Sequence, residues 1–299
     1  HWGTKVAIIQ DPDGHRFPME KYARLRALVD AAGLAGRDAL SVPHAATDVE
    51  LLRTHDRGYL QGVVDGTLAP AEMKRIGFPW TPQMVERSRR SAGATIEACR
   101  AALERGVGVN LAGGTHHAFR DRGEGYCVFN DSAVAALAMQ AEGRARRVAI
   151  LDCDVHQGNG TAAILAEEIS VFTFSIHGAN NFPFRKESSD LDIELPDGTT
   201  DDEYLVALED GVCHALSAGR PDLAIYLAGA DPFADDRLGR LALTKVGLAA
   251  RDAMVFSLCR DAGVPVAIAM AGGYARNIGD TVDIHLRTVR LAREMLADN

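Results

Sequence analysis

Short apolar runs alternate with longer amphipathic stretches along this chain, and this alternation constrains the fold more than any other feature. The runs have the length and composition of buried strands, and they cover residues 6–9, 39–42, 107–111, 148–151, 171–176, 223–227 and 264–270. Between them, apolar residues recur at three- and four-residue spacing, as in a helix, most clearly over residues 19–32, 82–105, 132–142, 202–218, 245–262 and 281–296. The pattern predicts a three-layer α/β fold, with a mostly parallel central sheet and helices on both faces.

The length of the chain is compatible with one large α/β domain. It has 299 residues, and we find no internal repeat, linker or low-complexity segment. We therefore expect a single domain over residues 1–299. Residues 66–81 carry few regular signals and are a candidate loop at the rim of a site.

The run at 148–151 leads directly into the polar sequence Asp-Cys-Asp-Val-His-Gln-Gly-Asn-Gly-Thr, and a helix-like segment begins at Thr161. In an open parallel sheet, ligands bind at the carboxyl ends of strands. Because alternate side chains of a strand share a face, Asp152, Asp154 and His156 could all point the same way. An aspartate and a histidine two residues apart are plausible metal ligands, although an aspartate at a strand end is often only a helix cap.

Two adjacent histidines follow another apolar run. His116 and His117 end the sequence Gly-Gly-Thr-His-His and precede Gly-Glu-Gly-Tyr-Cys-Val-Phe-Asn-Asp at residues 123–131. Adjacent histidines are awkward in a core, because each buried ring nitrogen needs a partner. They are either solvated rings in an exposed turn or a general acid/base pair, the role to which histidine is best suited near neutral pH.

Two further polar clusters also come directly after apolar runs. Asp231 follows the run at 223–227 and could be a third metal ligand, although a surface acidic loop would look similar. Tyr274 follows the run at 264–270 and the pair Gly272-Gly273. Glycines let the backbone approach a ligand closely, and a tyrosine offers a neutral hydrogen-bond donor. Taken alone, Gly-Gly-Tyr is equally a turn with a tyrosine packed on it.

Together these clusters resemble the histone deacetylase family, the zinc-dependent amidohydrolases with the arginase/deacetylase α/β fold. The resemblance extends from about residue 15 to about residue 285, and the motifs come in the family's order. It looks closest to class IV, which includes many bacterial proteins, through the sequences at residues 14–22, 156–160, 201–204 and 236–244. Asn159 stands where class I enzymes have aspartate. This difference affects the basicity of the neighbouring histidine and does not change the assignment to the family.

The resemblance implies two ion sites. Asp154, His156 and Asp231 match the zinc ligands and leave positions open for water and substrate, as a catalytic zinc requires. Such a site could also hold Fe²⁺, and either metal would polarise the amide carbonyl and lower the pKa of its bound water. A structural potassium ion is expected near Asp152, Asp154, His156, Ser175 and Ile176.

The resemblance also implies the catalytic roles. His117 matches the general base that activates water and then protonates the leaving amine, and His116 matches its electrostatic partner. Asp152 would bond His116 and Asn159 would bond His117. Because asparagine is neutral, His117 should be less basic than it would be beside an aspartate. Tyr274 matches the hydroxyl that stabilises the tetrahedral oxyanion.

A substrate channel is implied as well. Gly125 matches a backbone position of its lining, and Gly273 is also expected there. Tyr126, with Phe182 or Phe184, could form the aromatic walls that grip the aliphatic stem of a lysine. The segment containing His15 and Arg16 either folds near the pocket mouth or is simply solvated, and we assign neither residue a chemical role.

Composition adds limits. The net charge of −9, from 32 basic and 41 acidic residues, argues against direct nucleic-acid binding and is compatible with cationic substrates. No apolar run approaches the length of a membrane span, and no secretory signal is evident. Five cysteines without C-x-x-C spacing indicate reduced thiols, so we expect a cytoplasmic protein. Since the sequence begins at His1 and not Met, its natural start is left open.

The complete residue set predicts an active amidohydrolase that removes an N-acyl group from a lysine-like amine. The expected substrate is an acyl-lysine protein or peptide, including long fatty acyl groups. One alternative is a small-molecule enzyme that acts on acylated amines such as acetylpolyamines. Another is a metal-binding regulatory scaffold, against which the complete set argues. The relation to arginase is one of fold only. The sequence leaves acyl length, native metal and oligomeric state open.

Overall fold

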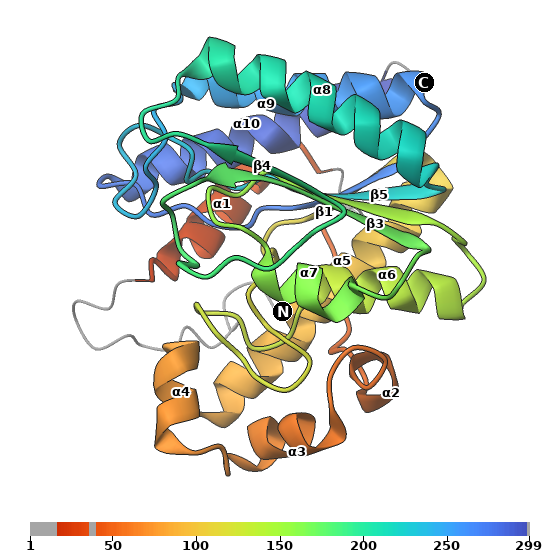
Figure 1. Ribbon diagram of the computed structural model, residues 1–299, viewed down its shortest axis with the longest axis vertical. Helices are drawn as coiled ribbons and strands as arrows, with labels where there is room; N and C mark the ends of the chain where they lie inside the picture. The colour runs from red at the N-terminus through yellow and green to blue at the C-terminus, as the bar shows by residue number, and fades with distance from the viewer. Residues whose placement is uncertain (1–16, 36–39, 298–299) are drawn as a thin grey trace.

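A parallel sheet forms the centre of the computed structural model, which describes residues 17–35 and 40–297 (Figure 1). Within these residues it has six strands in the order β1-β6-β5-β2-β3-β4, and every neighbouring pair is parallel. The strands are β1 (Val107–Asn110), β2 (Val148–Asp152), β3 (Val171–Gly178), β4 (Leu191–Leu195), β5 (Leu223–Leu227) and β6 (Val266–Ala269). Their carboxyl ends therefore share one edge of the sheet.

Helices cover both faces of this sheet (Figure 1). One face carries α8 (Asp201–Gly219), α9 (Lys245–Asp261) and α10 (Ile278–Ala297), and α1 (Glu20–Ala31) packs beside α10. The other carries α5 (Pro82–Arg105), α6 (Asp131–Ala141) and α7 (Asn159–Leu165). Beyond α5 lie the short helices α2 (Asp48–Leu51), α3 (Arg57–Asp65) and α4 (Pro70–Ile76). The predicted three-layer α/β fold is confirmed.

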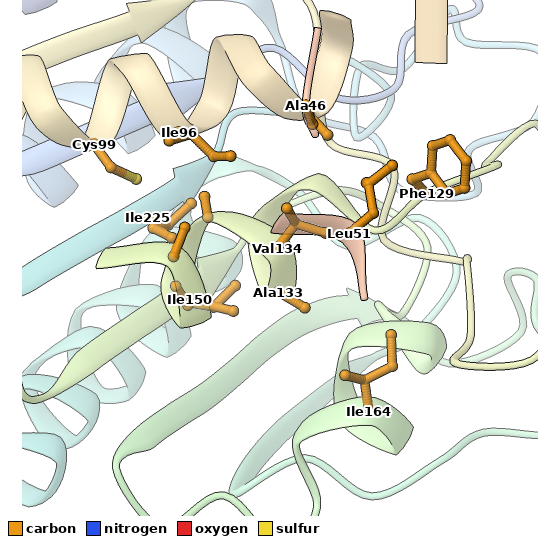
Figure 2. Close-up of a cluster of buried hydrophobic side chains, with 14 of the residues drawn as sticks. Ala46, Leu51, Ile96, Cys99, Phe129, Ala133, Val134, Ile150, Ile164 and Ile225 are labelled. Atoms are coloured by element: carbon orange, nitrogen blue, oxygen red, sulfur yellow. The ribbon is translucent and has the colours of Figure 1, made fainter. Parts of the chain in front are cut away.

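The central strand β2 contributes to a hydrophobic core on each side. Val148 and Ile150 belong to the core under α5 and α6, whereas Ala149 and Leu151 belong to the core under α8 and α9. Figure 2 shows the first of these cores, where Ile150 lies near side chains of α5 and α6. A strand buried on both faces reads as a continuous apolar run, because neither set of alternate side chains meets water.

Most expected elements agree with the observed ones to within a few residues, but the short helices α2 and α3 were not predicted and three further differences stand out. Residues 40–42 form no strand: Val42 is 52% exposed, and the following Pro43 lacks the N–H that a ladder needs. Conversely, β4 was not predicted, although Leu191–Leu195 alternates apolar and acidic residues. Helix α4 was also missed within residues 66–81, where Pro70 opens it and Gly77, with φ 88°, ends it.

Some expectations lie outside the described residues, namely the strand at 6–9 and the placement of His15 and Arg16. In the part of the chain that is described, no helix is both long and apolar enough to cross a bilayer.

Candidate active site

The predicted site residues gather at the carboxyl edge of the sheet. Asp152 ends β2, and the register places it beside Ser175 of β3 and Leu227 of β5. Loops that follow β1, β2, β5 and β6 all emerge at this edge, so segments more than a hundred residues apart in sequence meet there. This is the crevice in which open parallel sheets bind ligands.

Three buried side chains in these loops form a candidate metal centre. Asp154, His156 and Asp231 each offer one ligand atom, and these atoms lie within 4.8 Å of one another. His156 Nδ1 is 2.9 Å from Asp154 Oδ1 and 3.4 Å from Asp231 Oδ2. Asp231 Oδ2 is buried and has no hydrogen-bond partner among the described residues. A buried carboxylate oxygen without a donor is costly, and a divalent cation would satisfy it. One nitrogen and two carboxylate ligands fit Zn²⁺ or Fe²⁺.

Backbone donors hold the two carboxylates in place. The Val155 N–H donates to Asp231 Oδ1 at 3.0 Å, and the Gly272 N–H donates to Asp154 Oδ2 at 2.8 Å. A Cβ at residue 272 would overlap Asp231 Oδ2, so only glycine lets this loop lie against the ligands. Outer contacts of this kind orient metal ligands before the metal arrives.

The adjacent histidines have different partners and opposite pKa shifts. His116 Nδ1 donates to Asp152 Oδ2 at 2.6 Å, and His117 Nδ1 donates to Asn159 Oδ1 at 2.7 Å. Although burial opposes it, the charges of Asp152 and Asp154 raise the pKa of His116 to about 9. Burial and the nearby imidazoles hold the pKa of His117 well below its ordinary value. His117 is therefore neutral, with a lone pair on Nε2 that can accept a proton.

Tyr274 lies beside this cluster with its backbone fixed. Its N–H donates to Asp236 Oδ2 at 2.6 Å, and its ring centroid is 6.5 Å from that of His156. Burial, together with the charges of Asp231 and Asp154, raises the pKa of the phenol well above its ordinary value. The hydroxyl consequently keeps its proton and can donate a hydrogen bond.

Of the predicted channel residues, three lie against the catalytic groups. The Phe182 ring stands perpendicular to His117, with centroids 4.9 Å apart, and the Tyr126 ring is 6.3 Å from that of Tyr274. Gly125, with φ 55°, lies so near that a Cβ would be 2.8 Å from the His117 ring. Phe184 is 86% exposed and contacts Phe182 from outside, so Phe182 forms the inner wall.

A cavity of about 1790 Å³ joins these residues. It is lined by Phe182, His117 and Tyr274 around the metal centre and extends to Phe17 and Tyr22. The described lining includes Gly272 but not its neighbour Gly273, whose place in the channel stays a prediction. A Cβ there would meet Thr281 of α10 at 2.6 Å, which shows that this glycine serves packing.

The residues expected to bind potassium also lie together. Ser175 and Ile176 are buried in β3 beside Asp152, and the Gly178 N–H donates to Val155 O at 3.0 Å. This bond ties the end of β3 to the loop that carries Asp154 and His156. Ser175 Oγ is 2.9 Å from Nδ1 of the buried His177.

Two buried cations near the site were not predicted. Lys21 of α1 donates to Ala271 O at 3.0 Å, and its Nζ lies 5.5 Å from the centroid of the Tyr274 ring. Arg251 of α9 donates to the carbonyls of Gly229 and Cys153, beside the metal loops, and pairs with Asp252 at 2.8 Å. In both helices a charged residue occupies the buried face, and that signal could have identified them.

Comparisons with known proteins agree with this geometry. The sequence model of the histone deacetylase domain matches residues 15–289. An uncharacterized protein of Picosynechococcus sp. is 44% identical over 284 residues and 95% of each chain. The histone deacetylase-like amidohydrolase of Pseudomonas aeruginosa is 34% identical, over 88% of this chain and 73% of its own. Histone deacetylase 2 of Arabidopsis thaliana is 30% identical, over 90% and 73% respectively.

The fold has solved counterparts. The crystal structure of the HDA15 HD domain gives a TM-score of 0.78 at 25% identity, and the match covers 99% of this chain and 88% of that one. An HDAC homolog from Aquifex aeolicus gives 0.78 at 24% identity, covering 90% and 77%, which shows a shared fold. The chain belongs to the histone deacetylase family of amidohydrolases, within the arginase/deacetylase superfamily.

Proposed function

We propose that this protein is a metal-dependent hydrolase of N-acyl-lysine amides, which releases a free lysine amine and a carboxylate. One observation carries the proposal: a neutral His117, a protonated Tyr274 and three convergent metal-ligand side chains share one cavity. Amide hydrolysis needs a proton acceptor, an oxyanion donor and an electrophile at one carbonyl.

Asp154, His156 and Asp231 would hold Zn²⁺ or Fe²⁺. When bound, the metal acts as a Lewis acid that polarises the acyl carbonyl and acidifies water. Backbone donors already orient the carboxylates, so little rearrangement is needed for binding.

His117 acts as general base and then as general acid. Asn159 Oδ1 accepts a hydrogen bond from the Nδ1–H of His117. The free Nε2 can then take a proton from the attacking water and give it to the departing amine. His116, held protonated by Asp152, places a positive charge next to the negative charge that develops on the acyl carbon's oxygens. Tyr274 donates its hydroxyl proton in a hydrogen bond to the oxyanion.

Tyr126 and Phe182 would hold the aliphatic stem of the lysine. The cavity continues beyond the catalytic residues and is much larger than an acetyl group requires, which supports acyl groups longer than acetyl. Lys74 and Arg75 are exposed at the end of α4 and line the cavity beside Gly125. Glu124 lines the cavity next to them, so the choice of an acyl-lysine peptide rests on the aromatic walls formed by Tyr126 and Phe182.

Three subsidiary proposals accompany this function. A potassium ion binds near Asp152, Ser175 and Ile176, where it would stabilise the loop of the metal ligands. Residues 1–299 form one catalytic domain of class IV. The enzyme works in the cytoplasm, where its cysteines stay reduced.

Turnover on matched peptides tests the function. The set carries one lysine acylated with groups from acetyl to myristoyl, with acetylpolyamines alongside and metal content measured. We expect acyl-lysine hydrolysis and a loss of about a hundredfold or more in kcat for Tyr274→Phe with metal content unchanged. Turnover of acetylpolyamines alone would overturn the substrate class, and an undiminished Tyr274→Phe would overturn the mechanism.

A further inference from the structure

Arg87, on α5, is a half-buried cation in the wall of the cavity. Its Nε is buried and has no hydrogen-bond partner within the described residues, and its Nη1 reaches only Met19 Sδ at 3.8 Å. The guanidinium lies over the Phe78 ring, 4.8 Å from its centroid. No carboxylate of residues 17–35 or 40–297 pairs with it.

Other arginines of the same helix are paired. Arg89 is 2.6 Å from Asp48, Arg90 is 2.7 Å from Glu86, and Arg100 is 2.5 Å from Glu142. These three side chains reach the surface, where an ion pair is worth little. Arg87 differs from them because its Nε is buried and, within the described residues, has no partner, and a buried polar group without a partner is costly. Such a cost is commonly retained at sites that bind a ligand.

The surroundings of Arg87 are neutral and lie close to the catalytic groups. Arg87 interacts electrostatically with Tyr22 and Cys127, and burial raises the pKa of both, so neither supplies an anion at neutral pH. The Phe78 ring under Arg87 is 5.4 Å from that of Tyr126, which in turn faces Tyr274. Arg87 therefore lines the same cavity as His117, with the Phe78 ring between its guanidinium and Tyr126.

We propose that Arg87 forms an anion subsite in the interior of the cavity, which binds a carboxylate carried by the acyl part of the substrate. A guanidinium presents a planar fork that matches a carboxylate, and Tyr22 lies near it as a second donor. The substrate class is an acyl-lysine whose acyl group ends in a carboxylate, such as glutaryl-lysine. This inference rests on the proposed function, because hydrolysis brings the acyl group to this cavity. The carboxylate freed by hydrolysis is the other source of the same anion.

Binding of free acids to the metal-loaded protein tests the subsite without turnover. Glutarate and valerate have equal chain length and differ in the second carboxylate. We expect calorimetric titration to show glutarate binding at least about tenfold more tightly than valerate, and Arg87→Met to abolish the difference. Arg89→Met, which removes the same charge from the same helix outside the cavity, should preserve it. Equal affinities of wild type and Arg87→Met for both acids would overturn the proposal.

Hydrolysis of glutaryl- and butyryl-lysine peptides distinguishes the two sources. If the acyl group supplies the anion, the ratio of their kcat/KM values falls at least about tenfold in Arg87→Met and less in Arg87→Lys, which keeps the charge. If valerate binds as tightly as glutarate and Arg87→Met weakens both, the freed carboxylate is the ligand and the glutaryl specificity is overturned. If anion binding depends on Arg87 but no peptide is hydrolysed, the proposed function is overturned and the anion subsite is not. If peptides are hydrolysed but anion binding does not depend on Arg87, the anion subsite is overturned and the proposed function is not.

Discussion

The sheet edge and the interior of the cavity handle buried charge in opposite ways. At the edge, Asp152 pairs with His116, Asp154 lies against His156, and backbone N–H groups complete the set. In the interior, the described residues around Arg87 are the Phe78 ring, Met19 and the neutral Tyr22 and Cys127, with no carboxylate among them. The edge is preorganised for a metal and for proton transfer, whereas the interior retains an uncompensated charge that a ligand can neutralise.

Removing a metal ligand should have the largest effect. Asp231→Asn keeps the shape of the side chain but loses the charge of the carboxylate whose Oδ2 has no hydrogen-bond partner among the described residues. We expect metal affinity to fall by more than about a hundredfold, because loss of a ligand should cost more affinity than loss of a residue that only orients a ligand. Turnover should be lost with the metal. Metal content after dialysis against a chelator measures this directly. Metal retention equal to wild type would show that the cluster is not the metal site.

Different stability changes are expected from replacing Arg251 and Arg87. Arg251→Met leaves Asp252 and two carbonyls without their cation and should cost about 3–5 kcal/mol in the free energy of unfolding. Arg87→Met removes an unpaired charge and should cost nothing or stabilise the protein. Urea denaturation of both variants tests the contrast. A destabilised Arg87→Met would mean that Arg87 is compensated after all.

A buried histidine should make stability depend on pH. His55 Nδ1 donates to Phe119 O and its Nε2 accepts from the Asn130 N–H, and burial lowers its pKa to about 4. The unfolded chain, with a histidine pKa near 6.5, binds the proton first. Stability is therefore complete above about pH 6.5 and falls as the pH drops towards 4, by about 3 kcal/mol in total from this residue.

Denaturation of wild type and His55→Gln across this pH range isolates the contribution of His55. Glutamine does not titrate, so the variant should show a shallower loss of stability on acidification, whatever its absolute stability. Parallel curves for the two proteins would contradict the assignment.

The smallest effect is expected from charging the partner of His117. Asn159→Asp places a carboxylate 2.7 Å from Nδ1 and should raise the pKa of His117. Because the base must be neutral, the acid limb of the kcat/KM profile should move to higher pH by about one unit. An unchanged profile would show that the ionisation seen on the acid limb does not belong to His117.

The sheet edge was more predictable from sequence than the interior. The strand-ending motifs carry Asp154, His156 and Asp231 to one edge through strand register alone, so local pattern is sufficient. Arg87 stands in the run Glu-Arg-Ser-Arg-Arg, which is typical of a solvated helix face. Its contacts with Phe78 and Met19, which belong to other segments, partly withdraw it from water.

The same distinction explains the differences in secondary structure. Residues 40–42 are apolar enough for a strand, but pairing depends on a neighbour that periodicity does not specify. The five residues of β4 were overlooked because a short edge strand gives only a weak alternation. Lys21 lies on the inner face of α1, where hydropathy alone predicts an apolar residue, and its carbonyl partner is 250 residues away.

The tie between the channel wall and α4 bears on how the enzyme can diverge. The N–H groups of Gly125 and Tyr126 donate to the carbonyls of Arg75 and Ile76, so main-chain hydrogen bonds tie the wall to α4. These main-chain hydrogen bonds do not depend on the side chains that the helix carries. Substitutions at the exposed positions of α4 can therefore change the charge around the channel during evolution, while the distance between the channel walls stays the same.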